Sequence, residues 1–453
     1  MRVKYLKING FHNLNIQQEF TDSKIIGFIG NNGSGKSSVL EGIMDSFYIA
    51  QHLDTIDPSY VFNISYKIGE DVYRFENERT TFFMYKNGKK DIKNLMSYMP
   101  KAIFTYYAGE TTRLNQFAER YKEENKRYVD TIKNESEVPD FKFATDFSLK
   151  DFKLAFLVHY LYDTDCFKKV KKYLNFNEVD SRIILKLKKP GWAKNSQKNE
   201  LWRAKGLQKV FFDKLTEINE EYNSGAFARL DEDTRDYRDE IWLGLLHSDL
   251  FKSMFSTPLE LFMQLKALVD VELLDEVYIE VKKPKTNTNY DISFFSEGEK
   301  QLANLLMLLD LTKDYEALYL LDEFDAYLHL NWQRKFVKLL SDIDIKGQVF
   351  FTTHSPATIS GLRKDNVFIM HKGKIEPLRK EIFNRSVDDI MRENMDVSLR
   401  EPEIEKLIYD FKQKIFERNE EAALNLLSKL KTILSEEDPF FITAEIMLER
   451  FKL

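Results

Sequence analysis

The side chains best suited to chemistry form a glycine-rich loop near the N-terminus, with the sequence Gly30-Asn31-Asn32-Gly33-Ser34-Gly35-Lys36-Ser37. This spacing fits the phosphate-binding pattern G-x-x-x-x-G-K-S. Glycines let the backbone curl so that its N–H groups point at an anion, and the N-terminus of the following helix adds the positive end of its dipole. Lys36 is placed to reach the β- and γ-phosphates of a nucleotide, and the Ser37 hydroxyl is placed to ligate Mg²⁺.

The segments on either side of the loop support this interpretation. Residues 25–29 are apolar and predict a strand, whereas residues 38–41 are suited to a helix, so the loop joins a strand to a helix. A glycine turn that binds nothing is the alternative, and this context disfavours it. The predicted nucleotide contacts are Gly30, Asn31, Asn32, Gly33, Ser34, Gly35, Lys36, Ser37 and Ser38.

Two acids follow a second apolar strand, predicted at residues 318–321. A buried strand does not require carboxylates, so the position of these two acids at its end indicates a functional role. In a phosphate-binding protein Asp322 would hold the Mg²⁺ shell, and Glu323 would orient or deprotonate the attacking water. An acidic pair that merely ends a strand is the alternative.

Two weaker motifs accompany these. Ser296 to Gln301 opens an apolar helix and has the pattern of a capping box, although the same geometry aims a serine hydroxyl and free backbone N–H groups at an anion. Residues 350–353 predict a strand that ends at His354, where a sensor of the γ-phosphate would sit. A structural histidine is the alternative there.

The four motifs, in this order, resemble the ABC-type ATPases, in the AAA family branch that contains SMC, RecF and the OLD-like ATPases. The resemblance implies that ATP and Mg²⁺ are the cofactors and that ATP clamps two heads together in a homodimer or higher homo-oligomer. It identifies Gly30–Ser37 as Walker A, Ser296–Gln301 as the signature of the opposite subunit and Asp325 as the D-loop. The site residues that it implies are Glu323 and His354 for catalysis, Ser37 and Asp322 for the metal, and Ser296, Gly298, Glu299 and Asp325 as further nucleotide contacts.

This sequence departs from the family pattern in two places. Glu297 stands where the signature usually has glycine. The expected Q-loop glutamine is not evident where the predicted strand 102–107 ends in Ala108-Gly109-Glu110. Close approach of the signature backbone to phosphate, and magnesium coordination from the Q-loop side, are therefore left open.

The C-terminal region is similar to that of the Septu-type anti-phage defence ATPases (the PtuA family), which also occur with retrons. The similarity rests on 384–393, on Arg400-Glu401-Pro402, on two amphipathic helices between 402 and 434, and on Glu437-Asp438-Pro439. In that family the nuclease is a separate HNH subunit, so such a partner is implied, and DNA or retron nucleic acid is a candidate ligand. The tail helices cover each other and the core, or they dock the nuclease.

These patterns predict an α/β fold, a P-loop ABC-type ATPase head with a mixed sheet and an antiparallel β subdomain. Residues 1–109 would form the first half of the core and 276–376 the second half. A mainly helical insertion is expected at 110–275, with a short β element at 183–187, and a helical tail at 377–453.

Composition excludes several classes of protein. The chain has 453 residues, of which 43% are hydrophobic, so disorder is not expected over most of its length. One cysteine, Cys166, excludes an internal disulfide framework and a cysteine-rich zinc site. Neither a run of about 18 apolar residues nor a signal peptide is evident, which predicts a cytoplasmic protein without a membrane span.

The net charge of −6 argues against a uniformly basic coat for nucleic acid. A local patch with two nearby tryptophans, Trp192 and Trp202, could touch a phosphate backbone, but such runs are more often solvated faces. The lysines of this patch are Lys186, Lys188, Lys189, Lys194 and Lys198.

The leading prediction is an ATPase that regulates a separate nuclease in anti-phage defence and has no nuclease site of its own. Neither a Toprim acid set nor the histidine spacing of an HNH site is evident in the sequence. A RecF- or SMC-like DNA repair ATPase is the alternative, and the nucleotide-binding subunit of a transporter is a third hypothesis.

Overall fold

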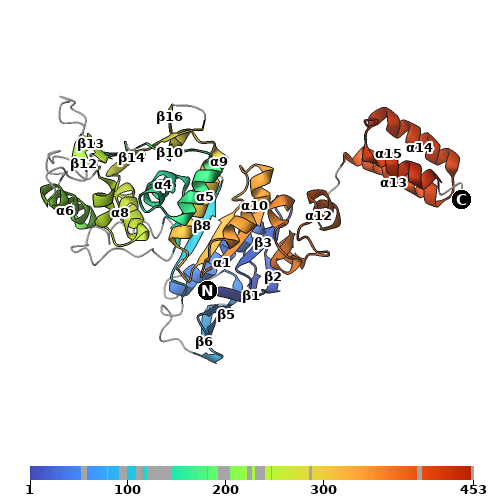
Figure 1. Ribbon diagram of the computed structural model, residues 1–453. Coiled ribbons are helices and arrows are strands. Elements are labelled where there is room, and N and C mark those ends of the chain that lie inside the picture. Colours follow the sequence, from blue (N-terminus) through green and yellow to red (C-terminus); the bar gives the residue numbers. More distant parts are fainter. Residues whose placement is uncertain are drawn as a thin grey trace. The chain divides into compact units, whose positions relative to one another are not determined.

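The computed structural model of the chain is built around a seven-stranded sheet with the strand order β20-β19-β3-β18-β17-β8-β9 (Figure 1). The structure describes residues 1–52, 59–78, 80–90, 99–108, 114, 116–117, 119, 144–180, 182–191, 202, 205–221, 227–229, 240–245, 247–284, 288–394 and 400–449. The chain divides into two units, Met1–Phe383 and Asn384–Leu453, which are taken separately.

The seven-stranded sheet is parallel except for the β19–β20 pair. Its strands are β3 (Ile25–Ile29), β8 (Ile103–Tyr107), β9 (Ala144–Asp146), β17 (Leu318–Asp322), β18 (Gln348–Thr353), β19 (Val367–His371) and β20 (Lys374–Pro377). The strands β3, β17 and β18 are buried along their whole lengths, as expected of parallel strands covered on both faces. In the parallel register Thr353 lies opposite Ile29 and Leu321 opposite Phe351. The residues that follow these three strands therefore meet at one edge of the sheet.

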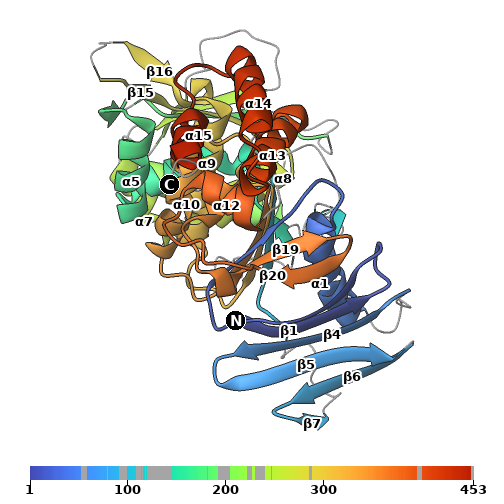
Figure 2. The same ribbon diagram turned by 90° about the vertical axis from the view of Figure 1, so that its right-hand side faces the viewer.

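An antiparallel sheet with the order β2-β1-β4-β5-β6-β7 forms the predicted β subdomain (Figure 2). Its strands are β1 (Arg2–Asn9), β2 (Asn15–Glu19), β4 (Val61–Ile68), β5 (Asp71–Glu78), β6 (Thr81–Lys86) and β7 (Lys89–Lys90). An Asn-Gly turn joins β6 to β7, and both of its residues, Asn87 and Gly88, have positive φ. Helix α1 (Lys36–Gln51) shares one apolar core with both sheets, which fixes its first turn beside β3.

The region between the two halves of the core is less purely helical than predicted. Its described helices are η2 (Leu149–Asp151), α4 (Phe152–Leu161), α5 (Asp165–Leu174), α6 (Gly206–Glu221), α7 (Ser248–Ser253) and α8 (Pro258–Asp270). The predicted β element at 183–187 is strand β11 (Ile184–Lys188), and it lies inside a four-stranded sheet, β12-β13-β11-β14. The other strands of this sheet are β12 (Phe227–Arg229), β13 (Glu240–Leu245) and β14 (Leu274–Tyr278), of which β13 and β14 pair directly with β11.

Strand pairing also shifts the boundaries of this region from those that the sequence predicts. Strand β9 falls within 110–275 but pairs with β8 of the central sheet, and β14 crosses the predicted boundary at 275/276. After β14, strands β15 (Glu280–Lys282) and β16 (Asn289–Asp291) pair with each other, and the distant β10 (Glu178–Val179) pairs with β15. Pairing between distant segments, which local patterns do not encode, moves these boundaries.

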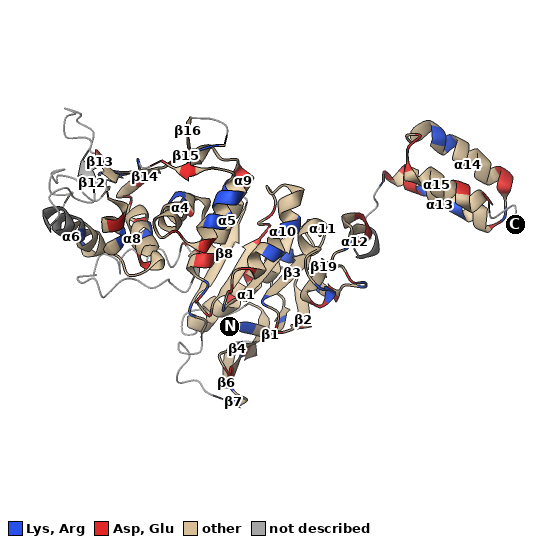
Figure 3. Cartoon of the chain, in the orientation of Figure 1, with Lys and Arg blue, Asp and Glu red and all other residues tan. Residues whose placement is uncertain are grey.

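The remaining helices of the first unit are α9 (Glu297–Leu311), α10 (Leu330–Ser341), α11 (Pro356–Ile359) and the short turns η4 (Ile292–Phe294) and η5 (Lys364–Asn366). Helices α4 and α5 pack on α9. Helix α5 buries Cys166, Phe167, Val170 and Leu174, and its lysines carry the charge visible on it in Figure 3.

The second unit contains α12 (Val387–Asn394), α13 (Pro402–Phe416), α14 (Glu420–Ile433) and α15 (Pro439–Glu449). The apolar faces of α13, α14 and α15 cover one another around Phe411 and Leu430. Arg400 binds Asp438 through two hydrogen bonds of 2.8 and 2.7 Å, and Asp438 also accepts the Phe440 N–H at the start of α15. Helices α13, α14 and α15 thus form a small hydrophobic core of their own. None of the described helices in either unit is both long and apolar enough to cross a bilayer.

Candidate nucleotide-binding site

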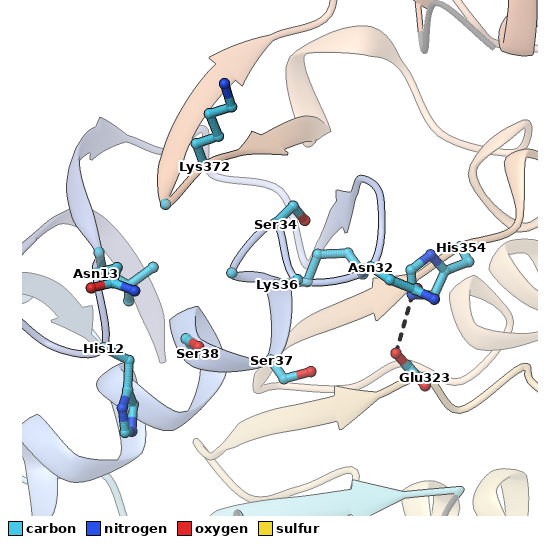
Figure 4. A pocket seen from close by; sticks show the side chains of 14 residues that line it. His12, Asn13, Asn32, Ser34, Lys36, Ser37, Ser38, Glu323, His354 and Lys372 are labelled. Atoms are coloured by element: carbon cyan, nitrogen blue, oxygen red, sulfur yellow. Dashed lines mark hydrogen bonds and ion pairs between the residues drawn. The ribbon is translucent and has the colours of Figure 1, made fainter.

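A pocket of about 1010 Å³ lies over the loop between β3 and α1, at the edge where the parallel strands end (Figure 4). It is lined by residues from five separate segments of the chain. These are His12, Asn13, Leu14, Asn32, Gly33, Ser34, Gly35, Lys36, Ser37, Ser38, Glu323, His354, Lys372 and Gly373.

The loop itself has the geometry of an anion cradle. Gly35 caps α1 with φ 104°, a conformation that side chains with a Cβ rarely adopt. The Lys36 ammonium donates to the carbonyls of Gly30 and Asn31, each at 3.1 Å, and burial lowers its pKa. Ser34 Oγ is buried and has no hydrogen-bond partner among the residues that the structure describes. An orphaned hydroxyl, a buried cation and a helix N-terminus at one pocket fit a phosphate group.

Opposite the loop, the first acid of the β17 pair meets Ser37. The Ser37 hydroxyl donates to Asp322 Oδ1 at 2.9 Å, and the Thr352 hydroxyl donates to the same oxygen. Burial raises the pKa of Asp322, while these hydrogen bonds oppose the shift. A hydroxyl and a carboxylate held together are the oxygen ligands that Mg²⁺ prefers, so these two residues fit the predicted metal site.

The second acid, Glu323, also meets His354, the histidine predicted as the γ-phosphate sensor. His354 Nε2 lies 3.2 Å from Glu323 Oε1, and the two side chains are 39% and 33% exposed, so water can reach them. Glu323 has φ 45°, and its backbone N–H donates to Thr352 Oγ1 at 3.0 Å. Thr352 therefore holds both acids, which the sequence motifs did not indicate.

Asp325, which the resemblance implies as a nucleotide contact in the D-loop, is buried outside the pocket of its own chain. It is only 3% exposed, and its Oδ2 accepts hydrogen bonds from the hydroxyls of Thr353, at 2.6 Å, and Thr358. Burial raises its pKa. In this geometry Asp325 ties the turn after β17 to the end of β18 and to α11, and it does not line the pocket of its own chain.

The signature residues also lie outside the pocket of their own chain. Ser296 caps α9 in the predicted capping box, in which Glu299 Oε2 accepts the Ser296 N–H at 2.9 Å. A Cβ on Gly298 would lie 2.4 Å from the carbonyl oxygen of Tyr327, so the start of α9 packs directly on the segment after β17. Glycine is thus needed at 298, one position after Glu297.

Two turns that sequence reasoning missed complete the pocket. His12, Asn13 and Leu14 come from the β1–β2 turn, and Lys372 and Gly373 from the β19–β20 turn. Gly373 joins the turns to the loop, because its carbonyl accepts the Asn15 N–H and its N–H donates to Ser34 O, both at 2.9 Å. Positive φ angles at His12, Asn13 and Lys372 mark these positions, but in the sequence they are ordinary turn residues.

The lysine patch gains no support as a nucleic-acid surface from the part of it that is described. Lys186 forms ion pairs with Glu240 and Asp275, and Lys188 also pairs with Asp275. The side chain of Trp202 is fully buried, so it offers no stacking surface, which corrects that part of the prediction. Trp192, Lys194 and Lys198 lie outside the described residues, as do Gly109 and Glu110 at the expected Q-loop.

Part of the chain is similar to known ATPases and to a family of AAA domains. Residues 186–360 match the family model described as "AAA domain, putative AbiEii toxin, Type IV TA system". The chain is 26% identical over 148 residues to "Septu protein PtuA" of Bacillus thuringiensis, a match that covers 31% of this chain and 37% of that protein. The resemblance to a Septu-type ATPase is confirmed.

A second relative is also described as an ATPase. The "Retron Ec83 probable ATPase" of Escherichia coli is 24% identical over 181 residues, which is 37% of this chain and 33% of that protein. The matches thus span about a third of the length of these relatives.

Solved structures were also matched. The SMC head bound to the C-winged helix domain of ScpA has a TM-score of 0.40 and 14% identity, and the match covers 83% of this chain and 98% of that one. The SMC head of Thermotoga maritima has a TM-score of 0.37 and 16% identity over 84% of this chain and 100% of that one.

Proposed function

We propose that this chain is an ATP-binding and ATP-hydrolysing subunit of a prokaryotic anti-phage defence system. The observation that carries the ATPase proposal is the convergence of three motifs on one pocket. The loop 30–38, the acids Asp322 and Glu323, and His354 lie far apart in sequence and line or flank the same space. The loop holds phosphate, Ser37 and Asp322 hold a divalent cation, and Glu323 with His354 places a base where water can enter.

In this proposal each residue has a distinct task. Lys36 exchanges the carbonyls of Gly30 and Asn31 for phosphate oxygens. Ser37 and Asp322 would hold Mg²⁺, which when bound neutralises charge on the phosphates. Glu323 accepts the proton of the attacking water, and His354, 3.2 Å away, holds that carboxylate in position.

We infer further that the site is completed by a second copy of the chain. Ser296 is exposed, and apolar side chains surround the same end of the molecule: Phe294 is 70% exposed, Tyr327 57% and Leu330 46%. Gly298 contacts Tyr327, so the exposed signature and these apolar residues belong to neighbouring segments. A homodimer that faces this surface toward the pocket of a partner chain would bury them and supply the signature to the partner's nucleotide.

The defence role rests on the similarity to Septu PtuA and the retron ATPase. By that similarity the chain would act in the cytoplasm and control a separate HNH nuclease, with DNA or retron nucleic acid as the ligand of the assembly. The tail offers exposed apolar side chains for such a partner, among them Tyr409, Phe416 and Ile442. These stay proposals, because the matches cover only part of each relative.

The test is turnover of ATP by the purified chain, measured as phosphate release with and without Mg²⁺, alone and with the product of the adjacent gene. We expect Mg²⁺-dependent release that the Asp322→Asn variant lacks. Phage protection by the gene pair should be lost in the same variant. Turnover that is unchanged in Asp322→Asn would contradict the assigned site, and protection without any ATP binding would contradict the function.

A further inference from the structure

Three side chains with metal-ligating atoms converge where α4, α5 and α9 meet, away from the nucleotide pocket. They are His159 of α4, Cys166 of α5 and Asp310 in the last turn of α9. Their ligating atoms all lie within 4.8 Å of one another. His159 and Cys166 lie on consecutive helices, whereas Asp310 is distant in sequence, so the packing of α9 on α4 and α5 brings the three together.

The histidine is oriented as a ligand. Its Nε2 lies 2.9 Å from the carbonyl oxygen of Met307, and since a carbonyl only accepts, Nε2 carries the hydrogen. The neutral ring therefore presents its lone pair at Nδ1, which faces Asp310 Oδ2 at 3.9 Å. A backbone carbonyl that fixes the tautomer in this way is a common outer partner of metal-bound histidines. Burial lowers the pKa of His159, which favours the neutral form that binds metals, and it raises the pKa of the Cys166 thiol, so the ion must displace the thiol proton on binding.

Asp310 and Cys166 each offer an atom that can bind a metal ion. Lys313 binds Asp310 Oδ1 at 3.0 Å, so Oδ2 is the oxygen that turns toward the histidine. Within the described part of the chain, the polar contact of Cys166 Sγ is a weak one, at 3.7 Å, with the carbonyl of Leu306. Cys166 and Asp310 also line a second pocket of about 320 Å³, which connects the cluster with solvent. A route for the ion and room for a water ligand are therefore present.

We propose that His159 Nδ1, Cys166 Sγ and Asp310 Oδ2 form a binding site for a thiophilic divalent cation of the Zn²⁺ type, with water from the second pocket as the fourth ligand. One nitrogen, one sulfur and one oxygen ligand suit this cation, whereas Mg²⁺ prefers oxygen alone. Binding replaces the S–H bond of Cys166 by a metal–sulfur bond and releases one proton to solvent.

The competing interpretation is a histidine that is satisfied inside the core. The Thr164 hydroxyl lies 2.6 Å from His159 Nδ1 and also caps α5 by accepting the Phe167 N–H at 3.1 Å. On metal binding this hydroxyl gives up Nδ1 and keeps its capping bond. The three ligands must also move together, because atoms on a tetrahedral zinc ion are roughly 3.3–3.8 Å apart. Rotation of the Cys166 and Asp310 side chains provides this movement.

A metal here would clamp the insertion helices to α9. Asp310 lies in the last turn of that helix, and the predicted signature residues lie at its start, so the ion would hold the far end of the element that presents the signature. The proposal does not depend on the ATPase function, because it concerns only the side chains at this junction.

The experiment uses the full chain, stripped with a chelator and titrated with Co²⁺ and then Zn²⁺. Since Cys166 is the only cysteine, thiolate-to-Co²⁺ charge-transfer absorption reports on this site alone. We expect one Co²⁺ per chain with micromolar or tighter affinity, displaced by Zn²⁺. Saturating Zn²⁺ should raise the melting temperature by about 3 °C or more.

Variants at the two less buried ligands separate the site from surface binding. Cys166→Ala should abolish the absorption and the thermal shift, and Asp310→Asn should weaken Co²⁺ binding at least tenfold, while both variants still fold. His247→Ala is the control, because His247 is an exposed histidine outside the cluster and should leave both signals unchanged. Absence of the charge-transfer band in the folded wild type, or a zinc shift that persists in Cys166→Ala, would overturn the proposal.

Discussion

Replacing Thr352 with valine tests how the pocket holds its two acids. The Thr352 side chain is fully buried; its hydroxyl donates to Asp322 Oδ1 and accepts the Glu323 N–H at 3.0 Å. Valine keeps the shape but loses both hydrogen bonds. A bond to a charged group contributes about 1.5–3 kcal/mol, and an unsatisfied buried N–H costs about 1–3 kcal/mol. We expect the free energy of unfolding to fall by roughly 2–5 kcal/mol, since neighbouring losses do not add fully.

ATP turnover by the Thr352→Val variant should also be slower, and its pH dependence identifies the cause. Displacing Glu323 and Asp322 should lower kcat roughly 10–100-fold, equivalent to about 1.4–2.8 kcal/mol in the barrier. Burial already raises the pKa of Asp322, and the Thr352 hydrogen bond opposes that shift. Without the bond the pKa rises further. Because only the carboxylate ligates Mg²⁺, activity is lost as pH falls through this pKa, so the acid limb of turnover should move to higher pH.

The assay is ATP turnover against pH at saturating Mg²⁺, with urea unfolding alongside. The matched control is Thr105→Val on strand β8, which flanks β17 on the side opposite β18, since Thr105 Oγ1 is buried without a partner among the described residues. That variant should match or exceed wild-type stability and keep the wild-type pH profile. If Thr352→Val showed the same acid limb and kcat as Thr105→Val, Thr352 would not position the acids.

Further substitutions test the remaining assignments. Lys36→Ala should weaken ATP binding at least a hundredfold in calorimetry, because the loop loses its phosphate cation; an unchanged dissociation constant would remove the site. Glu323→Gln should keep ATP bound, cut turnover at least a hundredfold and favour an ATP-bound dimer, and wild-type phosphate release would exclude Glu323 as the base. Ser296→Arg should abolish an ATP-dependent mass doubling in light scattering with nearly unchanged ATP affinity, so a persisting dimer would count against a shared site. Deleting the chain from Pro402 onward should release a co-purified nuclease while ATP still binds, and retention of the nuclease would place its contact elsewhere.

Much of the site could be predicted because its signals are local. The glycine spacing before Lys36, and the apolar runs that end at Asp322 and His354, are properties of short segments, and parallel strands bring such ends to one edge. The capping box at Ser296 could equally be predicted, because the two side chains that form it are three residues apart.

Local pattern could not show which of these residues share a pocket. Asp325 stands three residues after Asp322, yet its carboxylate is buried against Thr353 and Thr358, because the turn after β17 folds toward β18. The turn that contains Lys372 reaches the pocket because β19 pairs with β3, and the turn that contains His12 is linked to it by the hydrogen bond from the Asn15 N–H to the Gly373 carbonyl. The sequence by itself determined the chemistry of each segment, since composition and short-range periodicity carry it. The tertiary structure alone decided which segments face one another, because hydrogen bonds and packing between residues hundreds of positions apart leave no periodic trace in the chain.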